Sequence, residues 1–226
     1  MPERFERLVS ATLGVAGLAI AVTLIHREML SSASTRQPSA AAVPTTVRDW
    51  QQIARYGQEI GDSTSPTRII EFGDFECPAC RLFHDRLGNV LRESARKPSL
   101  VFVHFPLPMH RFAVSGARAA DCALRQQRFA QFHDALFADQ DSLGLKSWVS
   151  YAKEAGVPNT SAFDHCVRST SVDPLIQQGL SVGRRFEVTA TPTVIINGLR
   201  YSRVPSESVL AAALRSPNNF APGAPR

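Results

Sequence analysis

The amino-acid sequence predicts an α/β fold in which a block of helices interrupts the order of the strands. Three observations support this prediction. Strand-like apolar runs occur at 67–72 and 100–105, and a third run with a hairpin signal follows at 193–201. Between them, the stretch from about 112 to 182 has helical apolar spacing and no convincing strand. A Cys-Pro-Ala-Cys segment at 77–80 stands where the first strand gives way to a helix.

The first half of this body supplies two strands and two helices. Apolar residues spaced through Val47–Ile60 predict a short amphipathic helix that ends near one of two glycines. The run TRIIEF at 67–72 predicts a strand, and helical periodicity follows over 81–94. The run LVFVHF at 100–105 predicts a second strand. Pro106 ends it, because proline cannot donate to a strand ladder.

The second half is helical before it returns to strands. Helical patterns fill 112–168, and one more helix is expected near 174–182. The run TVII at 193–196 is followed by an Asn-Gly turn and a second short strand, which together predict a hairpin. A helix over Ser206–Leu214 closes the body, with a serine as its N-cap.

The first 25 residues carry a membrane-targeting pattern. Eighteen uncharged residues run from Leu8 to Ile25, behind Arg4 and Arg7. A helix of that length reaches about 27 Å, close to the ~30 Å hydrocarbon thickness of a bilayer. We therefore predict an N-terminal transmembrane helix that acts as an uncleaved signal anchor. A cleaved signal peptide is the alternative, although its apolar core is usually shorter, and a buried core helix would need an amphipathic stripe.

The predicted organisation has five segments. They are a short N-terminal tail at 1–7, a transmembrane signal anchor at 8–25, a flexible linker rich in Ser, Ala, Thr and Pro at 26–46, a domain at 47–215 with its helical insertion at about 112–182, and a loose C-terminal tail at 216–226. Basic residues nearly balance across the anchor, so they do not set its orientation. We place the domain on the periplasmic or extracytoplasmic side of the inner membrane because its cysteine chemistry suits an oxidising compartment.

The charge of the chain is modest and dispersed. It has 25 Lys and Arg against 20 Asp and Glu, a net charge of +5, with no dense basic block. Nucleic-acid-binding chains usually concentrate basic residues on one helix or loop. No nucleic-acid partner is therefore predicted, and mild basicity fits a protein near an anionic membrane surface equally well.

The Cys-Pro-Ala-Cys segment predicts redox chemistry. At the first turn of a helix, unpaired backbone N–H groups and the helix dipole stabilise a thiolate at Cys77. Pro78 is tolerated there, because an N–H in the first turn has no partner within the helix. One helical turn brings Cys80 within disulfide reach. Cys77 is then the attacking sulfur and Cys80 the resolving sulfur of a redox-active disulfide.

Two other interpretations of this pair are weaker. A zinc site would need two more ligands, and His104 and His110 lie further from the cysteines than usual zinc spacings allow. No metal is therefore predicted. An inert disulfide across two residues would constrain the unfolded chain very little.

Three segments resemble the DsbA/DsbG-like branch of thioredoxin-fold thiol–disulfide oxidoreductases, especially its membrane-anchored, exported members. They are IIEFGDFECPACRLFHDRL, ARAADCALRQQRFAQFHDALF and FEVTATPTVIING, and the resemblance covers most of 50–201. It implies a thioredoxin-like fold with a helical insertion. It also implies that Pro192 is preceded by a cis peptide and that Thr191 lies beside the sulfurs, where its backbone binds an extended substrate. The alternative is an ordinary trans proline that opens an edge strand.

Glu71 matches the acidic residue that thioredoxin-fold enzymes bury beneath their cysteines. Burial would raise its pKa, and we expect it to help move the Cys80 proton during exchange. A solvent-facing strand glutamate is the alternative. The sequence departs from the strongly oxidising members at Ala79, where they carry histidine, so a less oxidising potential is expected.

The two remaining cysteines, Cys122 and Cys166, fall in the predicted helical insertion. In an exported protein they can form a structural disulfide that closes a long loop. Two buried free thiols that pack as small apolar groups are the alternative.

The leading functional hypothesis is an enzyme that forms, rearranges or reduces disulfides through the Cys77–Cys80 couple. Its partners would be cysteine-containing exported proteins and a membrane redox partner that resets the pair, and it needs no metal or organic cofactor. A chaperone or binding module for exported chains without redox turnover, and a zinc-binding structural domain, are alternatives from other classes. The sequence leaves the direction of electron flow open.

Overall fold

The computed structural model describes residues 26–27, 43–169 and 173–220. The chain divides into two units, Met1–Ala42 and Val43–Arg226, and the second carries the fold. In the first unit, only the helical residues 26–27 are described. Within the described ranges, no helix is long and apolar enough to cross a membrane. The tail and signal anchor predicted at 1–7 and 8–25 lie outside the described residues.

Six strands form one mixed sheet in the order β1-β6-β5-β3-β4-β2. The strands are β1 (Thr45–Thr46), β2 (Gln58–Gly61), β3 (Arg68–Gly73), β4 (Ser99–His104), β5 (Thr193–Ile196) and β6 (Leu199–Tyr201). β3 and β4 pair in parallel, and the other neighbouring strands are antiparallel. The parallel pair needs a crossover connection, which α2 provides.

Seven α-helices and three short 3-10 helices are described. They are η1 (Trp50–Tyr56), α2 (Pro78–Glu93), α3 (Ala113–Leu124), α4 (Phe129–Ala138), η2 (Gln140–Ser142), α5 (Trp148–Glu154), α6 (Thr160–Val167), α7 (Pro174–Arg185), α8 (Glu207–Arg215) and η3 (Pro217–Phe220).

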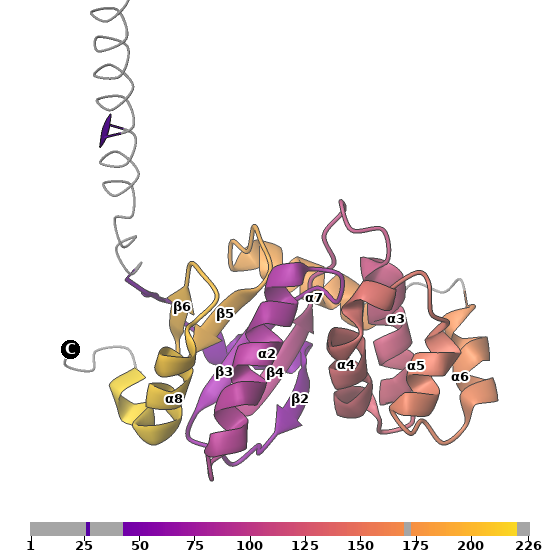
Figure 1. Ribbon diagram of the computed structural model, residues 1–226, viewed down its shortest axis with the longest axis horizontal. Coiled ribbons are helices and arrows are strands. Elements are labelled where there is room, and N and C mark those ends of the chain that lie inside the picture. Colours follow the sequence, from indigo (N-terminus) through magenta and orange to yellow (C-terminus); the bar gives the residue numbers. More distant parts are fainter. Residues whose placement is uncertain (1–25, 28–42, 170–172, 221–226) are drawn as a thin grey trace, which may run out of the picture. The chain divides into compact units, whose positions relative to one another are not determined.

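Helices cover both faces of the sheet (Figure 1). α2 and α8 lie over one face, where Ile69 of β3 shares an apolar cluster with Phe83 of α2. η1 and α7 cover the other face, where Ile70 shares a cluster with Val182 of α7. Successive strand residues point to opposite faces. Glu71 therefore lies on the same face as Ile69, beneath α2.

The helical insertion comprises α3 to α6 and lies beside the β4–β2 side of the sheet (Figure 1). Its interior is aromatic, with Phe132, Tyr151 and Phe163 fully buried. The insertion was expected to extend to about 182, which is wrong at that end. α7 packs on the sheet through Val182, so the insertion ends with α6.

The helix predicted over 47–60 is wrong in its second half. η1 ends at Tyr56, and Gln58–Gly61 forms β2 against β4. The reason is a close approach of two backbones at Gly57, where an added Cβ would lie 2.6 Å from the Phe102 carbonyl oxygen. Glycine permits this approach, and the following residues satisfy their backbone groups by pairing with the edge of the sheet.

Both segments predicted to be flexible contain regular structure near the domain. At the end of the predicted linker 26–46, Thr45 and Thr46 pair with β6 as strand β1. At the start of the predicted tail 216–226, Pro217–Phe220 forms η3, and Phe220 packs against the apolar cluster of α8. Edge pairing and burial of one aromatic ring thus extend the fold at both ends.

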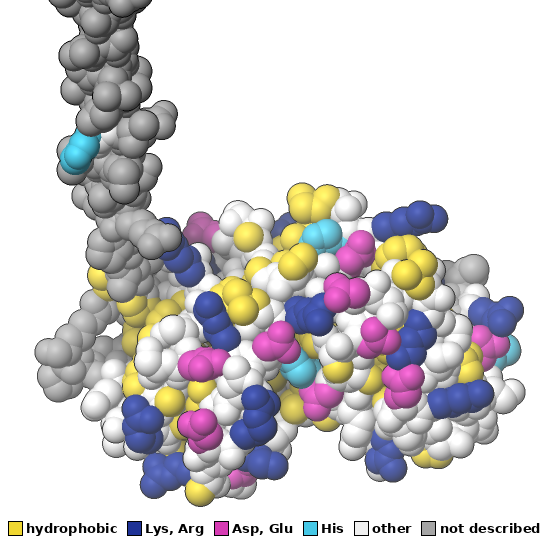
Figure 2. Space-filling view, in the orientation of Figure 1, with side chains coloured by type: hydrophobic (Ala, Val, Ile, Leu, Met, Phe, Trp, Pro, Cys, Tyr) yellow, Lys and Arg dark blue, Asp and Glu magenta, His cyan; other side chains and the backbone are white. Residues whose placement is uncertain are grey.

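The surface carries charges of both signs. Figure 2 shows Lys and Arg side chains interspersed with Asp and Glu side chains over the face that it draws. This mixture agrees with the dispersed charge of the sequence.

Candidate active site

The two cysteines occupy the first turn of α2, at the end of β3. Cys77 has an extended backbone and immediately precedes Pro78, the first residue of the helix. Cys80 lies one turn later and is fully buried, whereas Cys77 retains 6% of its surface. Both are free thiols in this structure. The strand delivers the chain to the helix N-terminus, and proline suits that position because it lacks an N–H.

Thr191 and Pro192 lie against the attacking sulfur. The pairing of Phe72 with Thr193 brings the start of β5 to the same end of the sheet as the cysteines. The Thr191–Pro192 peptide is cis. The Cys77 sulfur lies 3.3 Å from the Thr191 carbonyl oxygen, to which its protonated form donates. The buried Thr191 hydroxyl has no hydrogen-bond partner, so it is available to the sulfur or to a ligand beside it.

The environment separates the acidities of the two thiols. Hydrogen bonding from Cys80 has the largest effect on the Cys77 sulfur, and together with the nearby Thr191 hydroxyl and the backbone N–H groups of Cys80 and Ala79 it outweighs burial and lowers the pKa of Cys77 to about 5. Burial raises the pKa of Cys80 well above its usual value, and the bond to Cys77 adds to the rise. At neutral pH, Cys77 is therefore a thiolate and Cys80 a thiol.

Glu71 lies in the interior, only 1% exposed. Burial raises its pKa to about 8, a hydrogen bond with Cys80 opposes the rise, and the charge of Cys77 adds to it. One carboxyl oxygen has no hydrogen-bond partner. The solvent-facing alternative is therefore wrong, and the group has the protonation range of a proton acceptor near neutral pH. Its part in proton transfer stays a prediction.

A loop after β4 is bound to the cysteine turn by two acidic residues that the sequence analysis missed. The carboxylate of Asp74 accepts bonds from the Leu107 N–H at 2.8 Å and from His110 Nδ1 at 2.7 Å. Glu76 accepts a bond from the Phe112 N–H. Burial lowers the pKa of His110, but the hydrogen bond to Asp74 and the nearby negative charges together raise it by more, so the pKa lies above its usual value. Acidic residues in a turn beside the cysteines were the available signal.

The helical insertion also reaches the cysteine turn. Gln140 of η2 donates to the Phe75 carbonyl at 2.7 Å and to the Cys77 carbonyl at 3.0 Å. Arg81 of α2 forms an ion pair with Asp141 at 2.8 Å. Gln140 is 8% exposed, so both of its bonds lie in the interior. No local sequence pattern marks this residue, because its role depends on how the insertion docks.

A thioredoxin family model matches residues 54–215, which include the cysteine turn, the insertion and the closing hairpin. The chain belongs to the thioredoxin family. The DsbA-like resemblance is confirmed by solved structures. The chain shares 26% identity and a TM-score of 0.54 with DsbA2 of Pseudomonas aeruginosa, covering 69% of this chain and 91% of that one. BdbD of Bacillus subtilis superposes with a TM-score of 0.62 at 16% identity, covering 78% and 96%.

Two curated relatives of this thioredoxin-family chain carry different names. The Na(+)/H(+) antiporter NhaA 1 of Mycolicibacterium gilvum is 33% identical over 144 residues, 62% of this chain. The chain spans only 23% of the length of that relative. The probable disulfide bond formation protein D of Bacillus cereus is 26% identical over 154 residues, which cover 62% of this chain and 70% of the relative.

The remaining cysteines of this thioredoxin-family chain form a disulfide. Cys122 of α3 and Cys166 of α6 are joined within the insertion, with their Cα atoms 5.9 Å apart. The alternative of two free thiols is therefore wrong. The histidines considered for zinc are bound elsewhere, because His104 pairs with Asp121 at 2.9 Å and His110 with Asp74. In the described part of the chain, neither redox cysteine belongs to a cluster of three candidate metal ligands.

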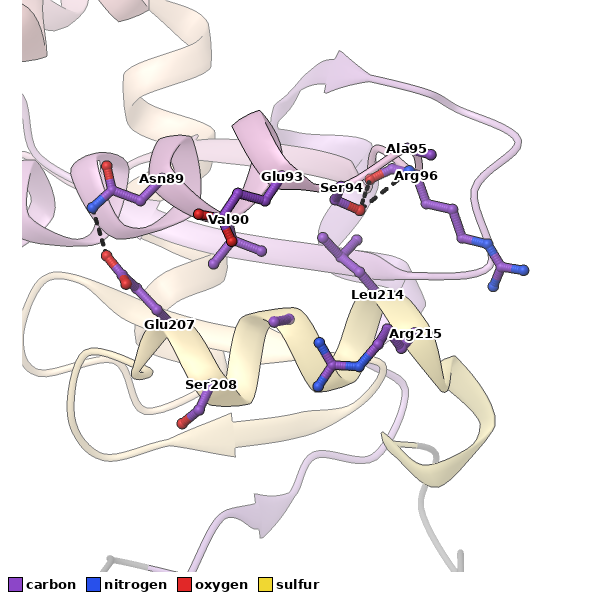
Figure 3. A pocket seen from close by; sticks show the side chains of 11 residues that line it. Asn89, Val90, Glu93, Ser94, Ala95, Arg96, Glu207, Ser208, Leu214 and Arg215 are labelled. Carbon is purple, nitrogen blue, oxygen red and sulfur yellow. Dashed lines mark hydrogen bonds between the residues drawn. The ribbon is translucent and has the colours of Figure 1, made fainter.

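A cavity of about 590 Å³ lies far from the thioredoxin-type cysteine turn. It is formed by the C-terminal half of α2 and by α8, whereas Cys77 precedes the N-terminus of α2 (Figure 3). Asn89 bonds Glu207 across its wall at 2.5 Å. Neither the redox pair nor the Thr191–Pro192 segment lines this cavity.

Proposed function

We propose that this protein is a thiol–disulfide oxidoreductase that forms, rearranges or reduces disulfides in exported proteins through Cys77 and Cys80. The observation that carries the proposal is the difference in pKa between two neighbouring thiols. The pKa of Cys77 is lowered to about 5, and the pKa of Cys80 is raised. A thiolate is the nucleophile in thiol–disulfide exchange, and the second cysteine stays protonated until it attacks the mixed disulfide.

The reaction proceeds through a mixed disulfide. In the reducing direction, the Cys77 thiolate attacks one sulfur of a substrate disulfide, and the other substrate sulfur leaves with the bonding electrons. The Cys80 thiol then gives its proton to Glu71 and attacks the Cys77 sulfur. The substrate leaves with two more electrons than it brought, and the cysteine pair becomes a disulfide. The reverse sequence oxidises a substrate dithiol.

Thr191 positions the substrate in this proposal. Its carbonyl oxygen lies 3.3 Å from the Cys77 sulfur. An extended substrate segment that pairs with this backbone would bring its own sulfur to the same place, as strand addition does elsewhere. The Thr191 hydroxyl, which has no partner, can donate to the thiolate.

The cellular setting is part of the proposal. The uncharged stretch at 8–25 supports a single-pass anchor in the inner membrane, with the catalytic domain on the periplasmic or extracytoplasmic side. The closed Cys122–Cys166 disulfide supports an oxidising compartment. A match within a longer relative named as an antiporter supports a place beside a membrane. A membrane redox partner would reset the cysteine pair.

The equilibrium reduction potential of the full chain, measured in glutathione buffers, tests the proposal. Attacking cysteines of pKa ~7 and ~3.5 accompany potentials of ~−270 and ~−120 mV. Because the pKa of Cys77 lies between them, at about 5, we expect a potential near ~−200 mV. A value close to ~−120 mV would indicate a disulfide donor, and one at or below ~−270 mV a reductant. The absence of any reversible couple at Cys77 and Cys80 would overturn the proposal.

A further inference from the structure

A cluster of three metal-ligating side chains lies between α2 and α4, outside the redox site. His84 of α2 meets His133 and Asp134 of α4, and one ligand atom from each lies within 4.8 Å of the others. His84 Nε2 is 3.2 Å and His133 Nδ1 is 2.9 Å from the same Asp134 oxygen. Ligand atoms around a tetrahedral zinc ion, with bonds of about 2.0–2.2 Å, have separations of about 3.3 Å.

The three side chains offer two ligand types that zinc uses in proteins. His84 and His133 each offer an imidazole nitrogen, and Asp134 offers a carboxylate oxygen. Imidazole and carboxylate groups are both common zinc ligands.

The cluster is closed on one side and open on the other. His133 is 1% exposed and lies edge-on to Phe75, Phe102 and Phe137. The Asp134 side chain is 61% exposed, and the His84 side chain is 25% exposed. An ion could therefore enter past Asp134 and keep a water on the open side. The ring nitrogens that do not face Asp134, His84 Nδ1 and His133 Nε2, are buried without a hydrogen-bond partner.

We propose that His84, His133 and Asp134 bind one Zn²⁺ ion, which joins α2 of the sheet domain to α4 of the helical insertion. Two imidazole nitrogens and one carboxylate oxygen are a donor set of catalytic-type zinc sites, with water as the fourth ligand. On binding, each neutral imidazole would move its proton from the nitrogen that faces Asp134 to its other ring nitrogen, and no oxidation state changes. The proposal does not rest on the redox function, although His84 lies one helical turn after Cys80.

Zinc binding to the untagged full chain carrying Cys77→Ser and Cys80→Ser tests the site. With the other two cysteines joined, this protein has no thiol to hold the metal. Equilibrium dialysis should give one Zn²⁺ per chain. Asp134→Asn and His84→Gln should each weaken the affinity by more than the 10–100-fold that loss of an outer-shell partner costs. His165→Ala, at an exposed histidine of α6, is the matched control and should bind as before.

The Co²⁺ complex supplies an independent readout. Visible absorption of bound Co²⁺ should have the intensity of a four-coordinate ion and should disappear in Asp134→Asn. Zinc should also raise the melting temperature of the starting protein but not of this variant, because only the folded site binds the ion. Asp134 is exposed, so this substitution is expected to leave the fold intact, as circular dichroism would verify. Failure of the starting protein to bind zinc, or equal binding by Asp134→Asn, would show that the three residues form only a hydrogen-bonded cluster.

Discussion

The two cysteine pairs of this chain are built from the same side chain and differ in almost every other respect. Cys77 and Cys80 are three residues apart, lie at a helix N-terminus and are free thiols. Cys122 and Cys166 are 44 residues apart and are joined across α3 and α6. The place of each cysteine pair in the fold therefore determines whether it is reactive or structural. A helix N-terminus makes one sulfur reactive, whereas the last turns of α3 and α6 place the other two sulfurs in a permanent link.

The difference extends to what surrounds each pair. Around the first pair, Glu71, Thr191 and Gln140 provide polar groups that bond to the sulfurs or to their backbone. The second pair joins the apolar and aromatic core of the insertion. A polar environment that favours one thiolate suits the first pair to exchange, whereas the second pair is already joined as a disulfide. Substitutions in one pair should consequently change activity, and in the other stability.

The largest expected effect is loss of exchange in Cys77→Ser. A serine hydroxyl is not ionised at neutral pH, so no mixed disulfide can form. Reduction of insulin by the variant, with dithiothreitol present, should fall to the rate without protein. Cys122→Ala/Cys166→Ala should retain most of the wild-type rate under conditions where it is folded. Equal loss of activity in both proteins would contradict the division of roles.

The second effect concerns stability. Replacing both Cys122 and Cys166 by alanine removes a link between residues that are 44 positions apart in the sequence. Because the unfolded chain then gains conformational entropy, the free energy of unfolding should fall by about 4 kcal/mol. For a domain of this size, such a change lowers the melting temperature by about 8–16 °C. Urea denaturation measures it. A loss under about 1 kcal/mol would mean that the insertion's aromatic core, and not the disulfide, holds α3 to α6.

The contrast between the pairs explains how far the sequence could be interpreted. The redox pair was predictable because the local sequence around CPAC indicates both the end of a strand and the start of a helix. The disulfide was left as one of two alternatives, since spacing along the chain does not say which helices touch. Gln140 was missed for the same reason, because its two bonds arise from docking of the insertion.

The fold shows the same division between local and distant causes. β3, β4 and the hairpin of β5 and β6 were predicted from apolar runs and the Asn-Gly turn. β2 was mistaken for the end of a helix, because the pairing of Gln58–Gly61 depends on β4, forty residues later. β1 has only two residues and no apolar side chain. Edge strands of this kind form when a partner edge is present, which no local pattern records.

A third and smaller effect is expected from Glu71→Gln. The amide cannot accept the Cys80 proton, so turnover should slow by about 100-fold, the lower end for loss of an acid–base group. The folded-state pKa of about 8 exceeds the ordinary 4.5. Between these values the folded protein binds more protons than the unfolded one, so this group's contribution to stability falls as pH rises, by at most about 1.4 kcal/mol per pH unit. Glu71→Gln should lose that dependence, as denaturation at pH 5, 6.5 and 8 would reveal.

The oxidation state of the Cys77–Cys80 pair distinguishes the contribution of Glu71 to the pH dependence of stability from that of the thiols. Cys77 has a folded-state pKa of about 5, below its ordinary 9.0, so between those values it contributes stability that increases with pH. In the reduced protein the two contributions oppose each other. Denaturation of the oxidised protein, in which Cys77 does not titrate, isolates Glu71. An unchanged turnover rate together with an unchanged pH slope would remove Glu71 from the mechanism.

The smallest predicted effect tests whether the two regions are coupled. Gln140 is an insertion residue that bonds the Cys77 carbonyl, and Gln140→Ala removes its hydrogen bonds to two buried carbonyl oxygens, at a cost of about 1–2 kcal/mol in the free energy of unfolding. A looser turn should also raise the pKa of Cys77 above about 5, which thiolate absorbance at 240 nm or the pH profile of alkylation measures. Gln177→Ala, at an exposed glutamine of α7, is the matched control and should change neither quantity.

If Gln140→Ala lowers stability but leaves the Cys77 titration in place, the insertion supports the redox turn without tuning it. If the titration also moves in Cys122→Ala/Cys166→Ala, the structural disulfide acts on the redox pair through η2.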